Sequence, residues 1–231
     1  MGRIETYGRC GITVNTLTNM RLYIFDFDGT LGDSRALIVK TMMDTFDEMG
    51  IQRPNTEACI DTIGLPLEQC FAVSAHLDEQ QSEACAAVYR QIFKINNVPG
   101  AVKPFPGVVE TLKRLHDEGH TLAIASSRRH ESLDGLVADF GVSRLFSAIV
   151  GADDVENAKP DPEPVNFILS RLHVEPQQAL VIGDAPYDIL MGRNAGTRTC
   201  AVTYGNGSRE ELSAAHPDTM ISHFADVLNV Q

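Results

Sequence analysis

The sequence predicts an α/β protein with a mainly parallel sheet flanked by helices and a small all-helical domain inserted near the start. Three observations support this class. Strand-like apolar segments alternate with amphipathic helices after Pro104, which is the order typical of a parallel sheet. A first strand stands apart at residues 22–25. Residues 35–103 between them have helical periodicity and almost no strand pattern, as expected of an inserted domain.

Composition limits the possible functions. With 231 residues and 43% hydrophobic content, the chain can bury one large core and carry a smaller insert. The net charge of −12 argues against binding to nucleic acid, which depends on neutralising phosphates. No stretch approaches the 18 or so apolar residues of a membrane span. Five scattered cysteines without a Cys-x-x-Cys pair are typical of a reducing compartment, so we expect a cytoplasmic protein.

The chain divides into three parts. Residues 1–19 have a mixed pattern without the apolar core of a signal peptide, and we expect a disordered extension that ends before Met20. Residues 20–34 and 104–231 are expected to form the core, and residues 35–103 the helical cap.

The cap is predicted to contain one long helix followed by shorter ones. Apolar residues at three- and four-residue steps, from Ala36 to Met49, predict a helix over 35–50 that Gly50 ends. Asn55 and Asp78 are suitable N-cap residues. Further helices are expected at 55–63, 66–75 and 78–95, before a linker at 96–100.

The segment after Pro104 has the pattern of a Rossmann-like core. We expect strands at 121–125, 146–150, 179–182, 199–202 and, shorter, at 220–221. We expect helices at 106–119, 131–140, 162–172 and 187–195, and a helix at the C-terminal tail. In such sheets ligands bind at the carboxyl ends of the strands, so polar residues that follow strands are the candidates for a site.

Asp26 and Asp28 directly follow the first strand. They are two residues apart, so their side chains start on the same side of an extended backbone. Two carboxylates at the end of a buried strand repel each other and lose solvation, so the pair needs a cation or a proton. Gly29 allows a sharp turn straight afterwards.

Ser126, Ser127 and Arg128 follow the next strand of the core. A hydroxyl at a strand end, beside free backbone N–H groups, can hold phosphate oxygens. A solvated helix cap is the commoner role of such a triplet, and exposure is the safer assumption for Arg128 and Arg129.

Two further segments carry charged residues at strand ends. Lys159 opens the segment Lys-Pro-Asp-Pro-Glu-Pro, in which prolines at alternate positions fix the direction of the lysine. Asp184 and Asp188 follow the strand at 179–182 across a helix start. Hard oxygen ligands on a rigid turn suit Mg²⁺, although Asp188 could simply stabilise the positive end of that helix.

Together, these segments resemble the four motifs of the haloacid dehalogenase superfamily in its phosphatase branch. They are Asp26-x-Asp28-Gly-Thr-Leu, Ser126, Lys159-Pro-x-Pro-x-Pro, and Gly183-Asp184-x-x-x-Asp188, in family order. The helical insert after the first motif, with Ile-Gly-Leu-Pro-Leu at residues 63–67, resembles phosphoglycolate phosphatase-like members.

The resemblance implies a catalytic mechanism. Asp26 would attack phosphorus and form an aspartyl-phosphate, and Asp28 would act as the acid and then as the base. Ser126 and Lys159 would hold the phosphate oxygens, with Phe27, Gly29 and Ser127 also at the phosphate. Mg²⁺ would be held by Asp26, the backbone carbonyl of Asp28, Asp184 and, through water, Asp188.

The resemblance therefore predicts an Mg²⁺-dependent phosphatase for a small phosphorylated metabolite. Phosphoglycolate, sugar phosphates, nucleotides and pyrophosphate all share this chemistry. Two alternatives to a phosphatase stay open: a phosphomutase of the β-phosphoglucomutase type and, less favoured, a non-catalytic binder of phosphorylated ligands. The absence of a Gly-x-Gly-x-x-Gly segment after the first strand disfavours a dinucleotide enzyme. The sequence leaves open whether the protein is a monomer or a dimer.

Overall fold

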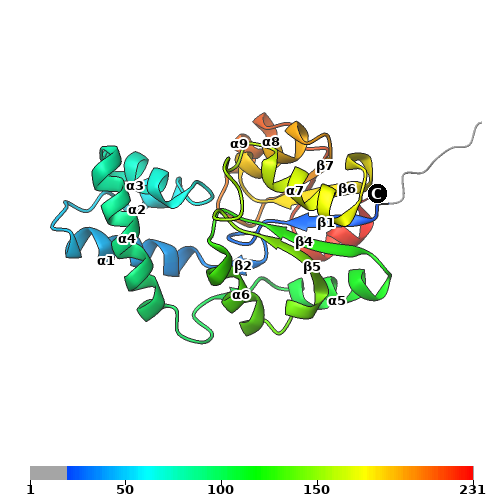
Figure 1. The fold of residues 1–231 in the computed structure, drawn as a ribbon, viewed down its shortest axis with the longest axis horizontal. Helices are drawn as coiled ribbons and strands as arrows, with labels where there is room; N and C mark the ends of the chain where they lie inside the picture. Colours follow the sequence, from blue (N-terminus) through cyan, green and yellow to red (C-terminus); the bar gives the residue numbers. More distant parts are fainter. Residues whose placement is uncertain (1–19, 231) are drawn as a thin grey trace, which may run out of the picture.

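The computed structural model describes residues 20–230, so the disorder predicted for residues 1–19 lies outside the described part of the chain. The predicted fold class is confirmed. Figure 1 shows an α/β core joined to a separate lobe of helices. The boundaries that we predicted for the cap, at residues 35 and 103, stay predictions.

Six parallel strands form the central sheet, in the order β5-β4-β1-β6-β7-β8. Their bounds are β1 Leu22–Phe25, β4 Thr121–Ala125, β5 Phe146–Val150, β6 Ala179–Gly183, β7 Arg198–Val202 and β8 Thr219–Ile221. β1 lies between β4 and β6, and Phe25 is in register with Ile124 and Ile182. The segments that follow these three strands therefore begin side by side at one edge of the sheet.

Helices cover both faces of the sheet (Figure 1). They are α5 Val108–Asp117, α6 His130–Asp139, α7 Glu163–Leu172, α8 Pro186–Asn194 and α9 Arg209–Ala214. Alternate strand residues face opposite ways: Tyr23 and Phe25 pack in the cluster that includes the α5 and α6 residues, whereas Leu22 and Ile24 pack with α7. Strands β1, β4, β6 and β7 are buried along almost their whole length, which explains their continuous apolar sequences.

The inserted lobe consists of α1 Arg35–Glu48, α2 Thr56–Ile60, α3 Leu67–Ala75 and α4 Glu79–Asn96. A row of aromatic rings joins three of these helices. Phe71 contacts Phe46 and Tyr89 at centroid distances of 5.3 and 6.0 Å. Asn55 and Asp78 are N-caps, as predicted, and their side chains accept bonds from the N–H groups of Ala58 and Gln81.

A short antiparallel ribbon connects the lobe to the core. It pairs β2 Gly32–Asp33 with β3 Lys103–Pro104. The sequence pattern did not predict these strands, because two-residue strands have no periodicity to detect. The ribbon brings both crossings of the chain together at the entrance to the cap.

Three other elements differ from the sequence prediction. Helix α9 was not predicted, although Ser208 and Glu211 form the capping box that begins it. The predicted tail helix is a 3₁₀ helix, η3 Phe224–Asn229. Helix α2 is shorter than the predicted 55–63 because the chain turns after Ile60.

The remaining composition-based expectations concern cysteines and membranes. The four described cysteines are buried and free. Among the helices of residues 20–230, none has the length and apolarity to cross a membrane.

Candidate active site

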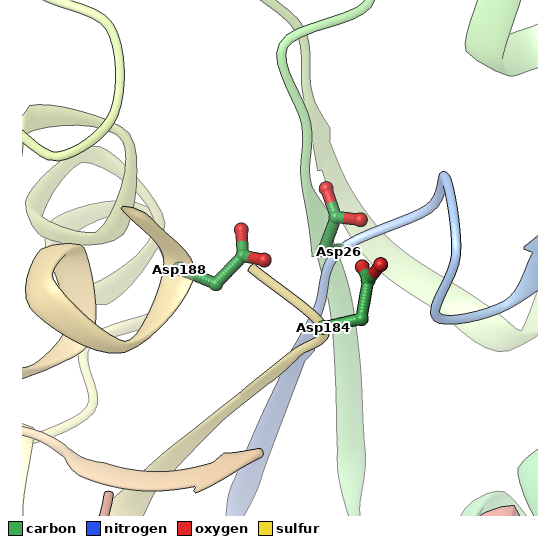
Figure 2. Close-up of side chains that lie close together, drawn as sticks. All are labelled: Asp26, Asp184 and Asp188. Atoms are coloured by element: carbon green, nitrogen blue, oxygen red, sulfur yellow. The ribbon is translucent and has the colours of Figure 1, made fainter. Parts of the chain in front are cut away.

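Three buried aspartates converge at the carboxyl edge of the sheet (Figure 2). Asp26 follows β1, Asp184 follows β6, and Asp188 lies in the first turn of α8. Each offers a carboxylate oxygen, and these oxygens all lie within 4.8 Å of one another. The sequence predicted that these three residues would meet, and the adjacency of β1 and β6 brings them together.

Lys159 neutralises part of this charge. Its Nζ donates to Asp26 Oδ1 and to Asp188 Oδ1, both at 2.6 Å. Its side chain is 2% exposed. Asp188 also accepts a bond from the backbone N–H of Ala185, so it caps α8 as well as binding the lysine. The interpretation that Asp188 stabilises the start of this helix is therefore supported, and its role at a metal ion stays a prediction.

A single lysine cannot neutralise three buried carboxylates. Burial, followed by the charges of neighbouring aspartates, raises the pKa of Asp26 well above its usual range despite the opposing effect of Lys159. Burial and the charge of Asp188 raise the pKa of Asp184 to about 7. The pKa of Lys159 is also raised, because Asp188 and Asp26 outweigh the effect of its burial. The excess negative charge and the hard oxygen donors fit a divalent cation such as Mg²⁺.

These pKa shifts predict that Mg²⁺ binding weakens at low pH. Without metal, the folded protein retains a proton on Asp184 that the unfolded chain loses near pH 4, so this group's contribution to stability falls as pH rises towards 7. Mg²⁺ must displace that proton. We expect its affinity to fall at least roughly tenfold per pH unit below 7, because Asp184 releases one proton per ion and the raised pKa of Asp26 acts in the same direction. Calorimetric titrations with Mg²⁺ at pH 6 and 8, in buffers of different ionisation enthalpy, measure the affinity and the number of protons released. Equal affinity at both pH values would contradict this prediction.

Asp28 lies apart from the cluster of Asp26, Asp184 and Asp188. Its Oδ1 accepts a bond from the hydroxyl of Ser34, and its Oδ2 accepts one from Arg128 Nε at 2.6 Å. The expectation that Arg128 is exposed is wrong, since its side chain is 10% exposed. Asp28 and the ring of Phe93, 4.8 Å from the guanidinium carbon, cover it. Arg129 is exposed, as expected.

The predicted phosphate-binding residues lie at the same edge, with different local bonds. Ser126 is buried, and its hydroxyl accepts the N–H of Arg128. The hydroxyl of Ser127 instead donates to the carbonyl of Gly64 in the cap, at 2.7 Å. The carbonyl of Phe27 accepts bonds from Leu31 and Gly32 and so fixes the loop.

Gly29 shapes the loop after β1 through its backbone conformation. Its N–H donates to the carbonyl of Gly32, so that donor is not available to a phosphate. Its φ is +88°, and a Cβ there would lie 2.0 Å from Asp184 Oδ2. Glycine is required because the loop passes directly over the aspartate.

The loop after β7 completes the site, and the sequence analysis missed it. The N–H of Asn206 donates to Asp184 Oδ2 at 2.6 Å, and its side-chain amide donates to the carbonyl of Asp28. A Cβ on Gly205 would lie 2.3 Å from the Cβ of Asp184. The signal that could have revealed this loop is the sequence Gly-Asn-Gly shortly after a strand end.

Arg35, the first residue of α1, binds the same loop from the cap side. It donates to Asn206 Oδ1 at 2.8 Å and to the carbonyl of Gly205. Residues that orient a metal ligand are commonly worth 10- to 100-fold in metal affinity, and Arg35 is one contact further out. We expect Arg35→Gln to raise the Mg²⁺ concentration that gives half of the thermal stabilisation by roughly threefold to tenfold.

Arg53→Gln is the matched control for this variant. Arg53 is an exposed arginine at the other end of the lobe and pairs only with Asp47 among the described bonds. We expect it to leave the half-stabilising concentration unchanged. An equal value for Arg35→Gln would mean that the contact with Asn206 does not tune the metal site.

A cavity of about 450 Å³ lies between this edge of the sheet and the cap. The core contributes Asp26, Asp28 and Ser126 to its lining, and the cap contributes Tyr89 and Phe93. This volume is in the range of pockets for small ligands. The site therefore combines a carboxylate cluster, a buried lysine and a cavity shielded by the cap.

Comparison with known families agrees with this geometry. Residues 23–202 match the family described as haloacid dehalogenase-like hydrolase. The chain belongs to that family. This hydrolase is 34% identical to the pyrophosphatase PpaX of Halalkalibacterium halodurans, over 90% of its own chain and 94% of the relative.

Solved structures of similar fold are also known. A haloacid dehalogenase-like family hydrolase from Streptococcus pneumoniae has a TM-score of 0.82 and 27% identity, over 92% of this hydrolase and 99% of that chain. A structure described as a predicted phosphoglycolate phosphatase from Haemophilus somnus has a TM-score of 0.81 and 22% identity, over 93% and 98%. The likeness to the second structure concerns the fold alone.

Proposed function

We propose that this protein is an Mg²⁺-dependent phosphatase that hydrolyses a small phosphate ester or anhydride through an aspartyl-phosphate on Asp26. The observation that carries the proposal is the position of Asp26. It lies at the end of the central strand, bonded to a buried lysine, with two further aspartates beside it and a cavity in front. A nucleophilic carboxylate needs such charge compensation when an anionic phosphate approaches.

Asp26 begins the reaction by attacking phosphorus. Its Oδ1 accepts a bond from Lys159, and we assign the attack to its other carboxylate oxygen. The bond between phosphorus and the leaving oxygen breaks as the bond to Asp26 forms. Lys159 and Ser126 hold the transferring group, because catalysis of this reaction depends mainly on positioning and charge stabilisation.

Asp28 moves the protons. It gives a proton to the leaving oxygen, then takes one from the water that attacks the aspartyl-phosphate and frees inorganic phosphate. The hydroxyl beside its Oδ1 belongs to Ser34. A hydroxyl can donate or accept, so this contact is compatible with both protonation states of Asp28.

Mg²⁺ would be held by Asp26, Asp184, the carbonyl of Asp28 and, through water, Asp188. Once bound, it would offset the negative charge of the phosphate and of the carboxylates. The cap, residues 35–103, would move about hinges near Ser34 and Pro104 to admit the substrate and exclude water.

The relatives narrow the substrate. The PpaX relative is named a pyrophosphatase, and the cap segment at residues 63–67 resembles phosphoglycolate phosphatase-like members. We therefore propose pyrophosphate and small phosphomonoesters such as phosphoglycolate as the first substrates to test.

The experiment is phosphate release from a panel of these compounds, sugar phosphates and nucleoside monophosphates, with Mg²⁺ and with EDTA. We expect release that requires Mg²⁺. Migration of the phosphoryl group on a sugar phosphate, without release, would indicate the phosphomutase. Mg²⁺-independent ligand binding with neither reaction would favour a non-catalytic binder.

A further inference from the structure

Arg128 is a buried cation at the cavity whose bonds are incomplete. Its Nε binds Asp28, and its Nη1 donates to the hydroxyl of Ser132 at 3.3 Å. Its Nη2 is buried and has no hydrogen-bond partner. A buried donor without an acceptor is costly, so this nitrogen is a candidate for binding a ligand that enters the cavity.

The other cations around the cavity are more exposed than Arg128 and have ion-pair partners, and the buried Nε of Arg90 also lacks an acceptor. Arg129 pairs with Asp153. Arg90 contacts Glu68 at 2.5 Å, and Lys94 contacts Glu131 at 3.3 Å. Lys94 and Glu131 are largely exposed, at 69% and 82%. Arg128 is therefore the most buried cation among the residues that line this cavity in the described chain, and it has a donor to spare.

The position of Arg128 defines which part of a substrate it can reach. In the proposed mechanism, Asp26 attacks phosphorus from one side and Asp28 meets the leaving oxygen on the other. Arg128 Nε lies 2.6 Å from Asp28 Oδ2. The guanidinium would therefore lie next to the leaving group of a bound substrate, and the ring of Phe93 holds it in place.

We propose that Arg128 forms a subsite for an anion on the leaving group, a carboxylate or a phosphate near the leaving oxygen. This inference rests on the proposed phosphatase function and names its substrate class, namely phosphate esters and anhydrides whose leaving group is itself charged. A planar guanidinium suits both anions, because its N–H groups match paired oxygen atoms. An alcohol without an anion leaves Nη2 unpaired.

The test compares three substrates. Pyrophosphate has a phosphate as leaving group, phosphoglycolate has a carboxylate on its leaving group, and ethyl phosphate has an uncharged one. We would measure kcat/KM for each with wild type, Arg128→Gln and Arg128→Lys. Any effect of Arg128 through Asp28 changes all three values, so the ratio of a charged substrate to ethyl phosphate isolates the subsite.

We expect Arg128→Gln to lower that ratio roughly 10- to 100-fold, the value of one charge-assisted hydrogen bond. Arg128→Lys should retain part of it, since it keeps the charge but loses the paired donors. If the glutamine variant does not fold, the lysine variant decides. Arg129→Gln is the matched control, because Arg129 is exposed and pairs with Asp153. If the ratio for pyrophosphate falls further than the ratio for phosphoglycolate, the subsite prefers a phosphate. The reverse result indicates a carboxylate.

A ratio unchanged in both Arg128 variants would overturn the inference. A second experiment tests the subsite independently of the proposed phosphatase activity. It measures by calorimetry the binding of methylenediphosphonate, a non-hydrolysable analogue of pyrophosphate. Binding that Arg128→Gln weakens at least roughly tenfold, relative to inorganic phosphate, would support the subsite even if wild type released no phosphate. Equal weakening of both ligands would count against it.

Discussion

Asp26→Asn is expected to abolish phosphate release from every substrate, by on the order of 10⁴-fold or more in kcat. An amide cannot form the acyl phosphate, and the remaining side chains can only position water. The substitution also removes one of three buried negative charges, so the metal-free variant should be at least as stable as wild type. The measurements are phosphate release with saturating Mg²⁺ and thermal unfolding with EDTA.

Asp33→Asn is the control for this experiment. Asp33 lies in the same loop, on β2, and its side chain is exposed. It should retain wild-type turnover. Turnover in Asp26→Asn at more than about one hundredth of the wild-type rate would show that Asp26 is not the nucleophile.

Lys159→Met is expected to cost both stability and activity. It removes the one cation that donates to Asp26 and Asp188 among the described side-chain bonds. Breaking a buried ion pair in this way costs about 3–5 kcal/mol. We expect that loss at pH 8 in EDTA and a smaller loss at pH 6, which lies below the pKa of about 7 of the neighbouring Asp184. Mg²⁺ should restore part of the stability. Turnover should fall on the order of 10²–10³-fold, because the transferring phosphate loses its charge partner.

Lys113→Met controls for the loss of a lysine, since Lys113 is exposed on α5. Denaturant unfolding at both pH values, with EDTA and with Mg²⁺, measures the effect. A loss that is the same at both pH values and insensitive to Mg²⁺ would mean that Lys159 stabilises the fold by packing and not by charge.

The sequence was sufficient where the signal is local. Each strand of the core is a short apolar run, and the polar residues that follow it mark a strand end. Parallel strands present their carboxyl ends at the same edge. The sequence alone therefore predicts that Asp26, Ser126 and Asp184 lie at one edge of the sheet, and the alternation of strands and helices predicts the fold class.

Arg128 shows where local reasoning fails. Its neighbours in sequence predict an exposed cap of α6. Its burial depends on Asp28, 100 residues away in sequence, and on Phe93 of the inserted helix α4. No pattern within one segment contains that information, because the desolvation of a side chain is set by whatever packs over it.

The sequence by itself determined the fold class, the helical insert and the residues at the strand ends, since these follow from periodicity and from the chemistry of adjacent residues. The tertiary structure decided which donors are engaged. The hydroxyl of Ser127 donates to the cap, the N–H of Gly29 donates within its own loop, and the N–H of Asn206 donates to Asp184. The physical reason is that hydrogen bonding and burial depend on the packing of segments distant in sequence, which propensity does not encode.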